Sequence, residues 1–298
     1  MDFEKIKQSL DRISLPQYVK FIAENNGKTC DKCRQYHGKV FEKNDSKRPV
    51  LPIHPNCRCE YQDIPISQQS AVLQEERQSI ASMLTVKHHL SHEQADDLAK
   101  QIICAKLENK KLNSEKLFLL FNGRFLLSSD GELLLDAVSG AATNKKIHPE
   151  NFILGQQQVE TRTFDYSYKR QGIENLGSIP VGLYYIRSSE ERSLEKIKMT
   201  HVLNVRGWGV CAWELHAAEG TDMRKRKGFF IHGGTVWGSA GCIDLRYNDT
   251  FFRLYLRKGN IDRLYVAVSY DKEFVEITEK QEVKNPAFYP ENFSYPNF

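Results

Sequence analysis

The stretch that decides the fold is KLFLLFNGRFLLSSDGELLLDAVSG, residues 116–140. It contains three apolar runs, which are separated by Asn-Gly and then by Asp-Gly. Short apolar runs joined by these dipeptides are typical of β-strands connected in hairpins. The sequence therefore predicts a β-rich region that begins near residue 113. Further strand-like runs follow at 177–188, 200–207, 209–217, 228–233 and 263–270.

The residues before this stretch follow other patterns. Between 66 and 112 the apolar residues recur at helical spacing, and Ser91 with Gln94 three residues later forms a capping box that starts the second of two helices. We therefore expect a multidomain α+β protein. Its parts are a Cys-rich module at 1–65, a helical connector at 66–112 and a β-rich domain at 113–298 that ends in an extended tail.

Charge and hydropathy exclude several classes of partner. A net charge of +4 gives little attraction to nucleic acid or to an anionic membrane. No apolar run approaches the ~20 residues of a membrane span, and residues 1–15 lack the apolar core of a secretory signal. We expect a protein that is made in the cytoplasm and binds no nucleic acid. The basic run MRKRKG at 223–228 is interpreted as a solvated loop.

The candidate chemistry lies in FFIHGGTVWGSAGCIDL, residues 229–245. His232 and Cys242 flank a glycine-rich turn, and a thiol near an imidazole suggests a nucleophile and its base. The N–H groups of Gly241 and Cys242 are candidates to receive a developing oxyanion. Ser239 is interpreted as a turn former or a hydrogen-bond partner, because its surroundings fail the Gly-x-Ser-x-Gly pattern of a serine nucleophile. This chemistry needs no cofactor.

These residues resemble the catalytic signature of L,D-transpeptidases, in which a histidine and a small residue precede a Ser-x-Gly-Cys-Ile/Val block. The segments DGELLLDAVSG and GSIPVGLYYI also resemble elements of that family, so the similarity covers roughly residues 113–280. The resemblance implies a β-sandwich-type fold and a Cys242 nucleophile that attacks the L-centre carbonyl of a peptidoglycan stem peptide. It also implies that His232 is the base and that the Gly233 carbonyl orients its other ring nitrogen.

The sequence departs from the housekeeping L,D-transpeptidases in two ways, and these differences indicate one branch of the family. The interval between His232 and Cys242 is shorter than in housekeeping members, and Ala240 and Asp244 replace the histidine and arginine that often flank Gly-Cys. Both features match the compact form found in antibacterial effectors of the type VI secretion system, which act as L,D-carboxypeptidases and exchange the terminal D-amino acid.

The effector resemblance also implies partners and a place of action. The partners are peptidoglycan tetrapeptide stems, an immunity protein and a component of the secretion machine, and the place is the periplasm of a target bacterium. Arg246 or the cluster at 224–227 is a candidate to bind a stem carboxylate. Hydrolysis and transpeptidation both remain open, because the outcome depends on whether water or an amine reaches the thioester.

The N-terminal cysteines form two close pairs, Cys30-x-x-Cys33 and Cys57-x-Cys59. Four thiols in two pairs are a ligand set for one tetrahedral zinc ion, and a small module with few aliphatic residues gains stability from a metal. Two disulfides are the alternative. Substitute metal ligands are His37 and His54.

The same segment, residues 28–62, resembles the C-terminal part of the phage-head morphogenesis (minor capsid) family. The matching residues are Cys30, Cys33, Gly38, Lys39, Phe41, His54, Pro55, Cys57, Arg58 and Cys59. This resemblance implies a small phage-derived module of the sort that is joined to toxin domains. The alternative function is therefore a phage structural or cell-wall-binding protein without catalysis.

Overall fold

The computed structural model describes residues 18–23, 29–46, 48–64, 71–150, 157–193 and 207–282. The N-terminal residues 1–15, most of the strand predicted at 200–207 and the C-terminal tail lie outside the described residues. Within the described residues, no helix is long and apolar enough to span a membrane.

The Cys-rich module contains a small antiparallel sheet with the strand order β2-β1-β3 and one short helix. Its elements are β1 (Tyr18–Ile22), α2 (Asp31–Tyr36), β2 (Val40–Glu42) and β3 (Glu60–Asp63). Phe21 is fully buried, and its ring lies 5.5 Å from that of Tyr61 and 5.8 Å from that of Tyr36. The core of the module is therefore a few aromatic rings beside the cysteines.

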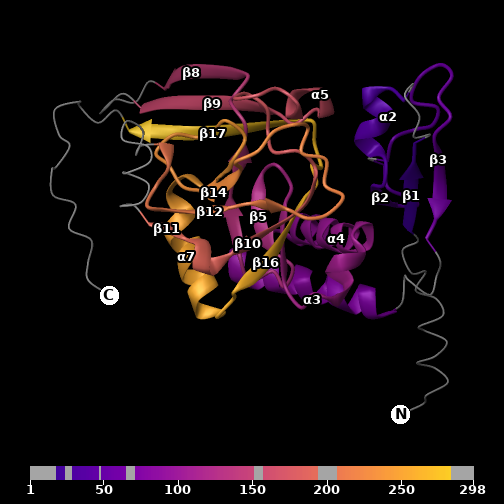
Figure 1. Cartoon of the computed structure of the whole chain (residues 1–298), viewed down its shortest axis with the longest axis horizontal. Coiled ribbons are helices and arrows are strands. Elements are labelled where there is room, and N and C mark those ends of the chain that lie inside the picture. Colours follow the sequence, from indigo (N-terminus) through magenta and orange to yellow (C-terminus); the bar gives the residue numbers. More distant parts are fainter. Residues whose placement is uncertain are drawn as a thin grey trace, which may run out of the picture.

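Two helices follow, α3 (Ala71–His88) and α4 (His92–Glu108), with a 3-10 turn η2 (Lys110–Ser114) after them. The predicted capping box is confirmed: Ser91 and Gln94 exchange side-chain and backbone hydrogen bonds at the start of α4. The helices run side by side along one side of the molecule (Figure 1). Leu84 and Ile102 are fully buried in a core shared with Leu120 and Leu127. The helical segment thus covers one face of the main sheet.

That main sheet has six strands and contains both predicted hairpins. Its strands, in order, are β13 (His216–Ala217), β10 (Gly182–Arg187), β16 (Arg263–Val268), β4 (Phe118–Phe121), β5 (Phe125–Ser128) and β6 (Leu134–Asp136). Leu120 pairs with Leu127, and Leu126 pairs with Leu135, both antiparallel. Gly123 turns the first hairpin with a φ of 94°, which favours glycine. The opening stretch therefore forms the strands that its pattern predicts.

A five-stranded sheet faces the main sheet across the largest hydrophobic core. Its strands, in order, are β11 (Arg192–Ser193), β12 (Cys211–Glu214), β14 (Phe230–His232), β15 (Ile243–Asp244) and β7 (Val138–Ser139). Helix α7 (Asp249–Lys258) packs against β12, where the Trp213 and Phe252 rings meet edge to face at 5.0 Å. The mixed α+β class predicted from the sequence is confirmed.

A further three-stranded sheet and several helical turns were not predicted. The sheet contains β8 (Asn144–Glu150), β9 (Gln157–Asp165) and β17 (Phe274–Glu282), which lie side by side along the upper edge of Figure 1. The turns are α5 (Tyr168–Gln171), η3 (Ser188–Glu190) and η5 (Arg246–Asn248). Charged residues such as Glu276 and Lys145 interrupt the apolar pattern of these strands, which explains why the pattern gave no strand signal.

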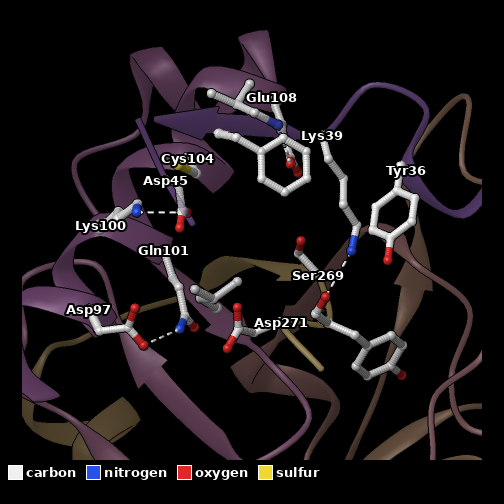
Figure 2. A pocket seen from close by; sticks show the side chains of 14 residues that line it. Tyr36, Lys39, Asp45, Asp97, Lys100, Gln101, Cys104, Glu108, Ser269 and Asp271 are labelled. Carbon is white, nitrogen blue, oxygen red and sulfur yellow. Dashed lines mark hydrogen bonds and ion pairs between the residues drawn. The ribbon is translucent and has the colours of Figure 1, made fainter. Parts of the chain in front are cut away.

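The Cys-rich module lies against α4 and the end of β16, at a cavity of about 120 Å³ (Figure 2). Lys39 Nζ donates to the Tyr270 carbonyl at 2.8 Å, and the Val40 N–H donates to Glu108 Oε1 at 3.1 Å. Burial lowers the pKa of Lys39 and raises the pKa of Glu108. The three sequence regions therefore share buried polar contacts.

Candidate active site

His232 and Cys242 lie on two neighbouring parallel strands. His232 is the last residue of β14 and pairs with Asp244 of β15, while Ile231 pairs with Ile243. Because side chains alternate along a strand, Ile231 and Ile243 enter the main core and His232 faces the other side. Cys242 precedes Asp244 by two positions, so its side chain leaves the same face as His232. The structure thus places the candidate base and nucleophile as diagonal neighbours on one face.

The turn between the two strands is tied to its own side chains. Ser239 Oγ donates to the Cys242 carbonyl at 2.7 Å and accepts the Gly241 N–H at 3.2 Å. The Asp244 carboxylate accepts the Gly238 N–H through Oδ2 and the Arg246 N–H through Oδ1, both at 2.8 Å. Ser239 therefore shapes the turn that carries Cys242. Because the Gly241 N–H is directed to Ser239, the Cys242 N–H is the better placed of the two oxyanion candidates.

Gly241 is held from two further sides. Its φ is 121°, and a Cβ built on it would overlap Arg226 Nη2, so both the backbone conformation and the space require glycine. Ser139 Oγ donates to the Gly241 carbonyl at 2.9 Å. Arg226 donates to four backbone carbonyls, those of Gln171, Gly177, Ser178 and Ala240. Within the basic run, Arg226 is therefore a partly buried clamp on the turn and not a solvated side chain, which corrects the loop interpretation.

The His232 ring is buried and has one nitrogen fixed. Its side chain is 3% exposed, and Nδ1 lies 2.5 Å from the Gly233 carbonyl. A carbonyl accepts only, so Nδ1 carries the proton and Nε2 is left as the acceptor. Burial lowers the pKa of His232 to about 4, although the Gly233 hydrogen bond acts in the opposite direction. At neutral pH the imidazole is uncharged.

Cys242 is 8% exposed, and its thiol is held in the protonated form. Burial raises the pKa of Cys242 to about 12; the nearby Asp244 charge adds to the rise, and a hydrogen bond from the Phe230 N–H opposes it. Burial also raises the pKa of Asp244 to about 7. The pair at rest is therefore a thiol and a neutral imidazole rather than an ion pair. Such a pair can react by general-base transfer of the thiol proton.

Two residues near the pair had no signal in the sequence. The Trp208 ring lies 4.9 Å from the His232 ring and 5.3 Å from the Phe230 ring. Asp249, at the start of α7, accepts the Val210 N–H at 2.6 Å. These contacts join residues that are distant in sequence, so no local sequence pattern could have found them.

The N-terminal cysteines meet around Cys33. Its Sγ lies 3.0 Å from His54 Nε2 and 3.8 Å from Cys57 Sγ. Cys30 caps helix α2, where its sulfur accepts the Cys33 N–H at 3.4 Å. Two sets of ligand atoms each fit within 4.8 Å: those of Cys30, Cys33 and His54, and those of Cys33, Cys57 and Cys59. This sulfur and nitrogen cluster can bind a metal ion, and zinc prefers such donors.

The cysteines of this cluster form no disulfide in the structure, and the pKa values of two of them are lowered. Although burial opposes the change, hydrogen bonds from the backbone N–H groups of Cys59 and Ile53 lower the pKa of Cys57 to about 7. The pKa of Cys30 is lowered in the same way by the Cys33 N–H. Metals bind thiolates, so these thiols suit a metal site. His37 accepts the Ala23 N–H through Nδ1 and belongs to neither set of ligand atoms.

Comparison with known proteins gave one family. Residues 163–268 match the Tlde1 domain, which is a domain of type VI secretion effectors. The match begins in β9, ends with β16 and includes both His232 and Cys242. It supports an antibacterial effector of the type VI kind. A search of curated proteins found no match.

Proposed function

We propose that this protein is an antibacterial type VI effector that acts on peptidoglycan stem peptides through Cys242 and His232. The activity is that of an L,D-carboxypeptidase, or of an L,D-transpeptidase that exchanges the terminal D-amino acid. The observation that carries the proposal is a buried thiol on the same sheet face as a histidine whose Nδ1 proton is fixed by the Gly233 carbonyl. The Tlde1 match over the same residues supports it.

The reaction begins when Cys242 Sγ attacks the stem-peptide carbonyl and His232 Nε2 takes the thiol proton. The carbonyl oxygen becomes an oxyanion, for which the Cys242 N–H is the candidate donor. The imidazolium then returns its proton to the leaving amine as the amide C–N bond breaks, which leaves an acyl thioester on Cys242. Water releases the shortened stem, whereas an amine forms a new amide. No cofactor takes part in these steps.

The contacts around the turn suit this sequence of steps. Ser239, Ser139 and Arg226 fix the backbone on both sides of Gly241, so the sulfur is held in place without a charge of its own. A neutral pair avoids keeping a charged thiolate and imidazolium in a buried site, where burial disfavours both. Charge therefore develops only as bonds change, when fixed N–H dipoles stabilise it best.

Mass spectrometry of muropeptides tests the proposed activity directly. Purified tetrapeptide stems are incubated with the parent protein, with Cys242→Ala and with the control Cys211→Ala, whose thiol is buried on the opposite face of the sheet. We expect tripeptides, or stems with an exchanged terminal residue, from the parent and from Cys211→Ala only. An unchanged substrate with folded parent protein would favour the structural or wall-binding alternative.

The place of action follows from the substrate. Peptidoglycan lies outside the inner membrane, so toxicity requires the protein in the periplasm of the target, and an immunity protein is the expected antagonist. We expect a Gram-negative host to lyse or swell when the chain carries an added signal peptide, and to grow normally when it does not. Equal toxicity of the cytoplasmic form, or of Cys242→Ala, would reject this part of the proposal.

We also infer that the N-terminal cluster holds one zinc ion with a structural role. The four ligands are proposed to be Cys30, Cys33, Cys57 and Cys59, with His54 as a substitute. Zinc would join the two halves of a module whose own core is small. Metal analysis of chain purified without chelator is the test. A folded, metal-free module without free thiols would establish disulfides instead.

A further inference from the structure

The candidate pair is covered by an aromatic side chain. The Trp208 ring lies 4.9 Å from the His232 ring, with 33° between their planes. The same indole meets the Phe230 ring at 5.3 Å and packs against the apolar cluster of Ala212, Phe230 and Cys242. One side chain therefore contacts the candidate base and the cluster that contains the candidate nucleophile.

The backbone that follows Trp208 is fixed in place. Asp249 Oδ2 accepts the N–H groups of Val210 at 2.6 Å and Cys211 at 3.2 Å. Gly209 has a φ of 64°, and a Cβ on it would lie 2.7 Å from the Gly233 backbone, beside His232. The chain can pass between Asp249 and Gly233 only with glycine at this position. The indole is thus anchored by a rigid neighbour on its C-terminal side.

We propose that Trp208 is a positioning residue of this site: its indole stays against the His232 ring and shields Cys242 until a substrate moves it off the sulfur. The shielding stands on contacts alone, whereas its consequence for turnover rests on the proposed function. A peptide carbonyl must come within bonding distance of the sulfur of Cys242, a residue that is 8% exposed, so the indole has to shift off the sulfur before attack. Once displaced, the indole offers an apolar wall to the arriving stem peptide.

The rate at which iodoacetamide alkylates Cys242 in the folded full chain tests the shielding. Trypsin places Cys242 and Cys211 in different peptides, 228–246 and 207–224, so each thiol is measured separately. Cys211 is fully buried on the opposite sheet face and reports unfolding. The proteins compared are the parent, Trp208→Ala, Trp208→Leu and Trp208→Phe.

We expect Trp208→Ala to raise the alkylation rate of Cys242 by about tenfold, as an aromatic contact of this size shifts an opening equilibrium by about that factor. The rate at Cys211 stays at the parent level, and Trp208→Phe restores most of the protection. Unchanged alkylation of Cys242 in a folded Trp208→Ala protein would overturn the proposal. If Cys211 also becomes reactive in Trp208→Ala, that variant is unfolding, and Trp208→Leu takes its place because leucine keeps apolar bulk without a ring. Faster alkylation of Cys242 in Trp208→Leu would then support the proposal, and unchanged alkylation would overturn it.

Turnover of tetrapeptide stems supplies the second readout. We expect Trp208→Ala to lower kcat more than it changes KM, because the imidazole loses its orientation, and Trp208→Phe to recover most of kcat. Faster alkylation with an inactive parent protein would reject the proposed function and leave the shielding intact. Normal kcat in Trp208→Ala would instead reject the positioning role while the proposed function stands.

Discussion

The two cysteine sites of this protein use the same histidine arrangement in opposite surroundings. In both, Nδ1 contacts a backbone carbonyl: His54 meets Pro55 at 2.8 Å, and His232 meets Gly233 at 2.5 Å. The contact with the Pro55 carbonyl and the nearby thiols raise the pKa of His54, whereas burial lowers the pKa of His232 to about 4. The thiols differ too, since the pKa of Cys57 is about 7 and that of Cys242 is about 12. In both comparisons the charged form of the side chain is favoured in the N-terminal cluster.

This comparison shows that burial sets the neutral state of His232 and Cys242, whereas backbone hydrogen bonds that outweigh burial lower the pKa of Cys57. Half-buried thiols that receive backbone N–H groups ionise easily and suit a cation. The buried Cys242 thiol, with a pKa of about 12, stays neutral until a base removes its proton during a reaction. A metal site and a proton-transfer site should therefore respond differently to substitution and to pH.

The largest effect is expected from removal of either member of the candidate pair. Cys242→Ala and His232→Ala should each lower activity on stem peptides by about 10³-fold or more, because a nucleophile and its base act as a unit. Circular dichroism and metal content should match those of the parent. Residual activity near the parent level in either variant would show that the chemistry lies elsewhere.

Loss of the N-terminal cysteine cluster should instead lower metal content and stability. Cys33→Ser removes the central thiol, and we expect loss of bound metal together with a lower melting temperature of the module. Cys104→Ser is the matched control, because Cys104 belongs to neither set of ligand atoms. Metal retained at parent stoichiometry in Cys33→Ser would contradict the assigned ligand set.

A smaller effect is expected at the clamp on the turn. Arg226→Lys keeps the charge but cannot donate to four carbonyls at once, so the backbone around Gly241 loosens. We expect activity to fall by about tenfold while metal content is unchanged. Lys227→Arg, a neighbouring change in the basic run, serves as the control. Equal activities of Arg226→Lys and the parent would indicate that the clamp is dispensable.

The smallest effect is expected from pH. A pKa of about 4 for His232 means that the neutral base is already present above pH 5, and a pKa of about 12 for Cys242 means that the thiol persists to high pH. The activity should therefore rise through about pH 4 and change by less than about twofold between pH 5 and pH 8. A steep change between pH 6 and pH 8 would contradict this profile and would assign control of the reaction to protonation of His232 or of Asp244, whose pKa is about 7.

Local signals in the sequence predicted much of the fold. The Asn-Gly and Asp-Gly turns and the Ser91 capping box each depend on a few consecutive residues, and each forms as predicted. Helix α7 was missed although its buried residues Phe252 and Leu256 have the i,i+4 spacing of an amphipathic helix, because a run of 10 residues carries few such repeats. The sheet of β8, β9 and β17 was missed because its strands are rich in charged and polar residues.

The residues of the candidate site also fall into two groups, those that a local sequence pattern identifies and those that it does not. His232, Ser239, Gly241 and Cys242 could be identified because they belong to one short stretch whose residue types suit nucleophilic chemistry. The surrounding residues Ser139, Trp208, Arg226 and Asp249 could not be assigned, because each acts through contacts that the packing of distant segments creates. Arg226 shows the difficulty: a basic run is usually solvated, yet this side chain turns inward to four carbonyls.

The most direct test of the account is a search for the acyl intermediate on Cys242. Tetrapeptide stems are mixed with the parent protein, the reaction is quenched with acid before completion, and the peptide 228–246 is examined by mass spectrometry. We predict a stem-derived acyl group on Cys242 that hydroxylamine removes and that Cys242→Ala lacks. Product formation by Cys242→Ala at the parent rate, with no acyl group on any cysteine of either protein, would contradict the account.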